Sequence, residues 1–398
     1  MRPGTRIMVV DQGRGVWGGQ RYLLRLAPLL ARRGFDLVLA GPPRLELAGA
    51  WARAGLERVD LDVPVARSIR RHGDVGPISP VRLSREMLSV RRVVADIAST
   101  TRRVGAAAVF ANAHWVHLDC ALAGRRSATP VMLHLHEEAV PGIGARLRGA
   151  AVRIADAAVA VSHDVATNLP SQVRGKATVV PNGVDVDVLR PGPADAAVRR
   201  SLGAGADEVL VVALTRLDPV KRIEDVVEAF ARAVRTVPGF PAHLAVIGST
   251  SGYPTYAEEM TARARAVLGE RVSFPGQRQD VADVLRAGDV LVHAGVVEGM
   301  PLGLLEAQAC GLPVVAYAAA GVAEAVVHGR TGLVVPPRDV EGLGQSLGRL
   351  LADPALRAGM GRAGRDHVLA QHTLDGQADT LAALTERLVA RRAKAAAA

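Results

Sequence analysis

Cysteine is almost absent from this chain of 398 residues, and so are the signals of export and membrane insertion. The two cysteines, Cys120 and Cys310, lie far apart in apolar contexts and form no Cys-x-x-Cys pattern. A disulfide framework is therefore not expected. The N-terminal residues lack the apolar core of a signal peptide, and no run of about 18 apolar residues offers a membrane span. These absences predict a reduced, cytoplasmic protein.

Aromatic residues are scarce as well, at 3% of the chain, while alanine, valine, leucine, arginine and glycine dominate. This bias is typical of a GC-rich bacterial genome. Lys and Arg total 49 against 39 Asp and Glu, a net charge of +10, which favours anionic partners such as nucleotides or phospholipid surfaces. The arginines do not alternate with aromatic side chains and no nucleic-acid reading motif is present, so we do not expect a nucleic-acid partner.

Short apolar runs alternate with helical patterns along the whole chain. Strands are predicted at residues 6–11, 35–40, 106–111, 130–138, 157–162 and 177–180, and again at 208–214, 243–247, 271–274, 289–293, 313–317 and 332–336. This alternation predicts an α/β protein with two doubly wound parallel sheets. Residues 188–193 contain three helix breakers and no periodicity, which indicates a linker. We predict a first domain over 1–188, a second over 189–372 and a terminal segment over 373–398.

A glycine-rich loop follows the first predicted strand. Gly13, Gly15 and Gly18 match the dinucleotide pattern G-x-G-x-x-G, but that pattern also needs an acid after the second strand. The second strand ends Leu-Ala-Gly-Pro-Pro, without an acid. A dinucleotide site is therefore disfavoured, and we expect the loop to let a ligand approach the backbone at Gly18 and Gly19.

Polar residues also end the strand at 130–138, where His134, His136, Glu137 and Glu138 stand together. Ligands of open α/β sheets bind outside the carboxyl ends of the strands, which places His136 well for hydrogen bonding to one. His114 is a further possible metal ligand, but the spacing of these residues matches no known metal motif, so no metal site is predicted.

The segment from Arg67 to Arg103 is rich in arginine and carries an apolar stripe between Met87 and Ile97. A basic amphipathic helix can lie on an anionic membrane. The same pattern also fits an ordinary solvated helix face, and the sequence leaves both interpretations open.

The most informative stretch is Val297–Gly311, in which a strand leads through a Gly-Met-Pro turn into a helix. Such a turn points free backbone N–H groups at one spot, which suits a phosphate. Two carboxylates, Glu298 and Glu306, bracket the turn and are suited to accept hydrogen bonds from sugar hydroxyls. This stretch predicts a sugar-phosphate ligand.

Two cations flank the turn after the first strand of the second half. Arg216 and Lys221 both lie where that strand ends. A guanidinium fork and an ammonium point charge together can neutralise a leaving diphosphate.

These motifs together resemble the retaining nucleotide-sugar glycosyltransferases of family 4. The resemblance rests on Arg216 with Lys221 and on Glu298-x7-Glu306 within Glu-Gly-Met-Pro-Leu-Gly-Leu-Leu-Glu-Ala-Gln-Ala-Cys-Gly-Leu-Pro-Val-Val. Further matches in the family's order are Gly18-Gly19, His134-Leu-His136-Glu137, Val180-Pro-Asn-Gly-Val-Asp185, residues 321–324 and Gly329-Arg-Thr-Gly-Leu333. The carboxylate-pair motif is specific, whereas the glycine pair alone is weak.

The resemblance implies the GT-B fold, with two Rossmann-like domains facing each other across a cleft and a terminal helix that crosses back to the first. It implies transfer of a sugar from a nucleoside diphosphate, with UDP the commonest nucleotide, to a hydroxyl acceptor, with retained configuration and no required metal or other cofactor. By this resemblance Arg216 and Lys221 hold the diphosphate, Glu306 holds the ribose, and the main chain of Gln277 and Arg278 meets the base. Glu298 contacts the donor sugar together with the backbone of Gly299, Met300, Pro301 and Leu302. His136 lies near the sugar and the β-phosphate.

One residue departs from the family pattern, because Arg222 follows Lys221 where a glycine is common. We expect it to alter the helix start without removing donor binding. Alternative functions are a GT-B enzyme without an acceptor, such as a nucleotide-sugar epimerase, an anion- or nucleic-acid-binding protein, and an inactive lectin-like relative. The acceptor is unassigned, and a glycan, a lipid-linked sugar or a small molecule would fit. Contact with the inner face of the membrane would fit the basic segment.

Overall fold

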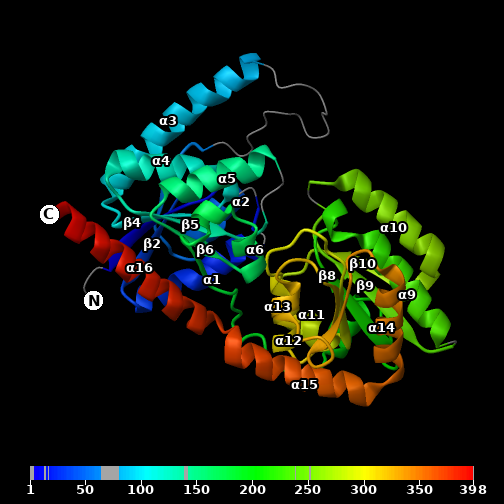
Figure 1. Cartoon of the computed structure of the whole chain (residues 1–398). Helices are drawn as coiled ribbons and strands as arrows, with labels where there is room; N and C mark the ends of the chain where they lie inside the picture. The colour runs from blue at the N-terminus through cyan, green and yellow to red at the C-terminus, as the bar shows by residue number, and fades with distance from the viewer. Residues whose placement is uncertain are drawn as a thin grey trace. The chain divides into compact units, whose positions relative to one another are not determined.

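The computed structural model describes residues 4–12, 15–16, 18–63, 80–138, 142–237, 239–250 and 252–397, with the main chain alone at 80–87 and 393–397. The chain forms two compact units. The first comprises Met1–Val180 with Gln377–Ala398, and the second comprises Pro181–Gly376. Each unit is a parallel sheet flanked by helices (Figure 1). The domain boundaries predicted from the sequence lie between residues 188 and 189 and between residues 372 and 373.

The first unit has a seven-stranded sheet in the order β3-β2-β1-β4-β5-β6-β7. Its strands are β1 (Thr5–Val10), β2 (Phe35–Gly41), β3 (Arg58–Asp60), β4 (Ala108–Ala111), β5 (Val131–Leu135), β6 (Ala157–Ala160) and β7 (Ala177–Val179). The central strands are apolar runs buried along nearly their whole length, as parallel sheets covered on both faces require. β5 ends at Leu135, earlier than predicted, so His136 lies just beyond the carboxyl end of the strand.

The helices of the first unit are α1 (Gly18–Arg32), α2 (Glu46–Arg53), α3 (Pro80–Val104), η1 (His114–Val116), α4 (His117–Ser127), α5 (Ile143–Ile154), α6 (His163–Thr167), α7 (Ser171–Arg174) and most of α16 (Leu374–Ala397). The apolar stripe predicted on the basic segment lies on α3, where Val93 and Ile97 are buried. Leu88 is 65% exposed. The arginines at 67, 70 and 71 lie outside the described residues.

The second unit has a six-stranded sheet in the order β10-β9-β8-β11-β12-β13. Its strands are β8 (Val209–Leu214), β9 (Ala242–Ile247), β10 (Val272–Gly276), β11 (Val290–His293), β12 (Val314–Tyr317) and β13 (Gly332–Val335). Its helices are α8 (Ala196–Ser201), η2 (Pro219–Lys221), α9 (Ile223–Thr236), α10 (Pro254–Leu268), η3 (Gly269–Arg271), α11 (Val281–Ala287), α12 (Leu302–Ala309), α13 (Val322–Ala325), α14 (Val340–Ala352) and α15 (Pro354–Gln371). The predicted α/β class with two doubly wound parallel sheets is confirmed.

The segments through which the chain enters and leaves the second unit lie side by side within it. Val184 N donates to His372 O at 2.9 Å, and Leu374 N donates to Val184 O at 2.9 Å. Val184 and Thr373 form a parallel bridge. A Cβ atom at Gly183 would collide with Thr373 O, so this close approach requires glycine.

None of the helices in the described ranges is long and apolar enough to cross a membrane.

Candidate functional site

Two of the predicted donor residues of the second unit, Lys221 and Glu298, meet where its strand order reverses. β8 and β11 are neighbours in the sheet, although β9 and β10 separate them in sequence. The loop after β8 carries Lys221 and the loop after β11 carries Glu298. Val296 N donates to Val220 O at 2.9 Å and ties the two loops together. In open α/β sheets such a switch point is where ligands bind.

Glu298 is the electrostatic centre of this site. Its Oε1 atom lies 2.6 Å from Lys221 Nζ and 2.8 Å from His293 Nε2. The residue is 7% exposed. Burial alone would raise the pKa of Glu298, but Lys221 and His293 outweigh it and lower that pKa to about 2. A Cβ atom at Gly295 would collide with Glu298 Oε1, so glycine is needed beside the carboxylate.

The other predicted diphosphate ligand, Arg216, lies on the same loop as Lys221. Its Nη2 atom is 3.0 Å from Asp218 Oδ2, and the side chain of Asp218 is 6% exposed. Asp218 Oδ1 also accepts from Val220 N at 3.1 Å and caps η2, the turn that ends at Lys221. Asp218 therefore orders the loop that carries both cations, a role that the sequence analysis did not assign.

Arg222 explains how the chain tolerates its departure from the family pattern. Its φ is +54°, in the left-handed region that glycine adopts most easily. The guanidinium makes two hydrogen bonds to Asp225, at 2.9 and 3.0 Å, and Nη1 lies 3.0 Å from Glu224 Oε1. Tyr317 OH also donates to Asp225 Oδ2 at 3.0 Å. The side-chain contacts thus hold Arg222 in a conformation that its backbone disfavours, and α9 starts directly after it.

The turn before α12 has its carbonyl groups bound to protein. Gly299 O accepts from Gly321 N at 2.9 Å, and Met300 O accepts from Asn182 Nδ2 at 2.8 Å. Among the described residues, the amide groups of Gly299, Met300 and Leu302 donate to no protein acceptor. Pro301 is the N-cap of α12. The turn therefore offers N–H donors at a helix N-terminus, as the sequence predicted.

Glu306 stands on the second turn of α12. Its neighbours Leu304, Leu305 and Ala307 are buried, while Glu306 itself is half-buried. The ribose contact that the resemblance implies for it stays a prediction.

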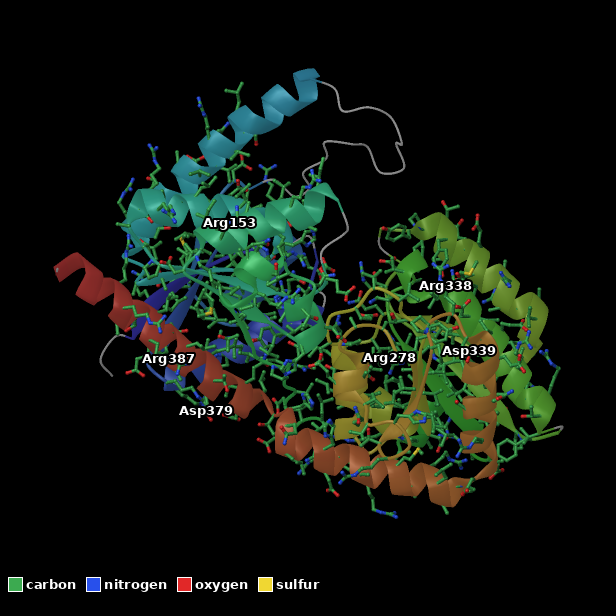
Figure 2. All side chains as sticks on the ribbon, viewed as in Figure 1. Arg153, Arg278, Arg338, Asp339, Asp379 and Arg387 are labelled. Carbon is green, nitrogen blue, oxygen red and sulfur yellow. The ribbon has the colours of Figure 1, made fainter. Side chains whose placement is uncertain are left out.

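Gln277 and Arg278 follow β10 at the edge of the sheet, two strands from β8. Arg278 (labelled in Figure 2) makes two hydrogen bonds to Asp280 and one to Ser201 Oγ at 3.0 Å. Its side chain is thus used inside the protein. Only the main chain of Gln277 and Arg278 is proposed to meet the base.

The first unit places a second polar cluster at its own switch point, where β1 neighbours β4. Asn112 Nδ2 donates to Asp11 Oδ2 at 2.5 Å, and His136 Nε2 lies 2.7 Å from Asn112 Oδ1. Because the amide nitrogen of Asn112 is turned to Asp11, its oxygen is the acceptor and His136 Nε2 carries the proton. Burial first, then His114 and Arg148, lowers the pKa of His136 to about 4. At neutral pH His136 is uncharged and its Nδ1 is an acceptor.

The remaining residues predicted in the first unit lie on α1 and on the loops after β4 and β5. Gly18 and Gly19 begin α1, and Tyr22 of the same helix makes an edge contact with the His136 ring at 6.2 Å. A Cβ atom at Gly19 would meet no atom within 4 Å. His114 Nδ1 lies 3.1 Å from Glu137 Oε1. Within the described ranges, no group of three His, Cys, Asp or Glu side chains is arranged to hold a metal ion, and this includes the histidines and glutamates near the end of β5.

Comparison with known proteins decides the family. Residues 16–188 match the sequence profile of Glycosyltransferase Family 4, and residues 208–353 match that of Glycosyl transferases group 1. A D-inositol 3-phosphate glycosyltransferase of Kribbella flavida is 33% identical over 294 residues, 68% of this chain and 69% of the relative. One of Acidothermus cellulolyticus is 30% identical over 411 residues, 93% of this chain and 88% of the relative. The chain belongs to glycosyltransferase family 4.

Solved structures agree with this family in fold. The Anabaena protein HepE, crystallised with UDP and glucose, superimposes with a TM-score of 0.79 at 20% identity, over 96% of this chain and 100% of that chain. Together with the two parallel sheets, this likeness shows the GT-B fold. This family 4 chain is therefore a glycosyltransferase of the GT-B type, as its sequence motifs implied.

Proposed function

We propose that this chain transfers a sugar from a nucleoside diphosphate, with UDP as the favoured nucleotide, to a hydroxyl acceptor with retention of configuration. The observation that carries the proposal is the buried Lys221–Glu298 pair beside the free amide groups of Gly299, Met300 and Leu302. Cation, carboxylate and N–H donors at one switch point match the charge, hydroxyls and phosphate oxygens of a sugar diphosphate.

Lys221 and Arg216 stabilise the negative charge that develops on the diphosphate as the bond to the sugar breaks. The amide groups at the start of α12 add fixed dipoles of the same sign. These positive groups supply the electrostatic help that a divalent ion gives in other transferases, which supports a reaction without a metal. Activity that survives exhaustive chelation is expected, and a loss rescued by a divalent ion would overturn this part of the proposal.

Glu298 is suited to binding rather than to proton transfer. A general base works best with a pKa near the operating pH, and the pKa of Glu298 is about 2. Its Oε1 atom also bonds to both Lys221 and His293. We assign Glu298 to the hydroxyls of the donor sugar. The leaving phosphate then accepts the proton of the attacking hydroxyl on the face from which it departs, which retains the configuration.

Donor and acceptor are proposed on different grounds. HepE was crystallised with UDP-glucose, which supports UDP as the nucleotide. The relatives act, by name, on D-inositol 3-phosphate, so that compound is one acceptor to test beside glycans, lipid-linked sugars and small metabolites. The first unit, with His136 and the loop before α1, is the proposed acceptor side.

A screen of nucleotide sugars tests the donor. UDP-sugars should raise the melting temperature of the wild-type chain through linkage, more than GDP-sugars do. Stabilisation by GDP-sugars alone would overturn the choice of UDP. Turnover of the bound donor without any acceptor would favour an epimerase instead, and a retained anomeric configuration in the product would support the transferase.

We also propose that the first unit of this enzyme contacts an anionic membrane from the cytoplasmic side. Outward residues of α5 combine apolar Ile143 and Leu147, which are 48% and 45% exposed, with exposed Arg146 and Arg153. Figure 2 labels Arg153. This charge and apolarity suit acidic lipids. At low salt the wild-type protein should bind to vesicles of phosphatidylglycerol and sediment with them. The Leu147→Glu variant should stay in the supernatant. Equal binding to neutral vesicles would contradict the proposal.

A further inference from the structure

Asn182 links the start of the second unit to the turn that is proposed to hold the donor sugar. Its side chain is buried, with 7% of the residue exposed. Nδ2 donates to Met300 O at 2.8 Å across 118 positions of sequence. Its own backbone oxygen lies 3.1 Å from His372 Nδ1. The sequence motif Val180–Asp185 contains this asparagine, but the motif assigns no role to its side chain.

The backbone that carries Asn182 is held firmly. Gly183 lies against Thr373 O with no room for a side chain, and Val184 exchanges hydrogen bonds with His372 and Leu374. The main chain of Asn182 is therefore anchored independently of the turn, and its side-chain amide offers Met300 O a donor at a fixed place.

The hydrogen bonds to the two carbonyl groups decide where the amide groups of the turn point. A trans peptide is planar, with its N–H opposite to its C=O. Gly321 holds Gly299 O and thereby fixes the direction of Met300 N–H. Asn182 holds Met300 O and fixes the Met300–Pro301 peptide plane. That plane carries no N–H, because residue 301 is proline, but it sets where α12 begins and thereby where its first N–H, that of Leu302, points. The two donors together define the orientation of the whole turn.

We propose that Asn182 is a positioning residue that sets the affinity for the sugar part of the donor by orienting the Met300–Pro301 peptide. This inference rests on the proposed function, in which the turn at 299–302 contacts the donor sugar. In this proposal Asn182 acts through the turn and not by contact with the donor or the acceptor. Its effect should be larger on the sugar than on the nucleotide, because the two cations proposed for the diphosphate, Arg216 and Lys221, lie on another loop and do not depend on the direction of the turn.

Two substitutions separate orientation from packing. Asn182→Asp keeps the shape but replaces the donor with an oxygen that repels Met300 O, whereas Asn182→Ala removes more volume. If the hydrogen bond matters, Asp should be the more damaging change for donor use. If the residue only fills space, Ala should be. The exposed Asn168, changed to alanine, is the matched control and should behave as wild type.

The measurement compares UDP with UDP-glucose. In Asn182→Asp the dissociation constant for UDP should stay within about twofold, while that for UDP-glucose rises at least about tenfold, as expected for one lost charge-sensitive hydrogen bond. Asn182→Ala should give a smaller rise, and it decides the matter if the Asp variant does not fold. Unchanged UDP-glucose affinity in both variants would overturn the inference. A wild-type chain that binds no nucleotide sugar would overturn the proposed function first, and the inference with it.

Discussion

Glu298 shows how one carboxylate can stay charged inside the protein. Burial opposes its ionisation, but the ammonium of Lys221 and the ring of His293 both lie within 2.8 Å of the same oxygen. Lys221 supplies the positive charge that balances the Glu298 carboxylate. A diphosphate bound at this site would place its negative charge next to two cations, Lys221 and Arg216.

The first prediction concerns this pair. Glu298→Ala and Lys221→Ala should each lower kcat/KM by at least about a hundredfold, because each removes one charged contact to the donor in the transition state. Initial rates at saturating and limiting donor test this. The solvent-facing pair Arg232–Glu228 on α9 is the control, and Glu228→Ala should stay within about twofold. Near-wild-type rates in both site variants would refute the assignment.

At the scale of elements, the contribution of Arg222 to stability can be tested quantitatively, because this residue precedes α9 with a left-handed backbone conformation. Arg222→Gly relieves backbone strain of about 1–2 kcal/mol. It also removes the guanidinium from Asp225, whose side chain is 6% exposed, and breaking a buried ion pair costs about 3–5 kcal/mol. The hydrogen bond from Tyr317 OH to Asp225 remains. The net expectation is a loss of about 1–4 kcal/mol in the free energy of unfolding, measured in urea.

Arg338 supplies the control for that experiment. Its φ is +67°, and among the described residues its exposed side chain has no hydrogen bond or ion pair (Figure 2). Arg338→Gly should therefore be neutral or stabilise by up to about 1 kcal/mol. A stabilising Arg222→Gly would mean that the ion pairs to Asp225 contribute less than the strain costs.

Helix α1 tests whether a ligand, rather than the fold, requires glycine. A Cβ atom at Gly19 has open space around it, so Gly19→Ala should not lower stability. If acceptor or donor approaches the backbone there, transfer should fall about tenfold or more. Gly359→Ala, which also has open space in α15, should leave the transfer rate unchanged. Full activity of Gly19→Ala would remove that loop from the site.

Local signals in the sequence predicted the elements better than the contacts between them. Apolar runs gave twelve of the strands, but β3 was missed because its three residues, Arg58–Asp60, carry two charges. The turn at Glu298 was readable because strand, glycine and helix follow one another directly. The roles of Asp218 and His293 in ordering the site were not predicted, because in sequence they cannot be told from an ordinary capping residue and an ordinary strand residue. Asn182 escaped because its partner lies 118 positions away.

At the scale of the whole molecule, buried histidines should make stability depend on pH. Burial lowers the pKa of His134 to about 3 and those of His136 and His372 to about 4, from an ordinary 6.5. Between pH 6.5 and 4 the unfolded chain binds protons at these sites and the folded chain does not, so stability falls as the pH falls. Each such histidine removes about 1.4 kcal/mol at pH 5.5.

Thermal unfolding at pH 7.5 and 5.5 measures this effect. A lower melting temperature at pH 5.5 is expected, and His372→Asn, which removes one titrating ring, should reduce the difference. An equal or higher melting temperature at pH 5.5 would contradict the prediction. The histidines lie in both units, so each unfolding transition should shift.

The hydrogen bonds between Val184, His372 and Leu374 have a consequence for how this enzyme can be recombined. The second unit is one uninterrupted stretch of chain, Pro181–Gly376, and its two ends are bonded to each other. It is thus an insertion whose entry and exit lie at one place. The residues proposed for the diphosphate, the ribose and the base all lie inside this insertion, whereas His136 lies in the first unit. We therefore expect that a nucleotide preference can be exchanged between relatives as a single cassette, cut at two adjacent points, while the first unit keeps its own sequence.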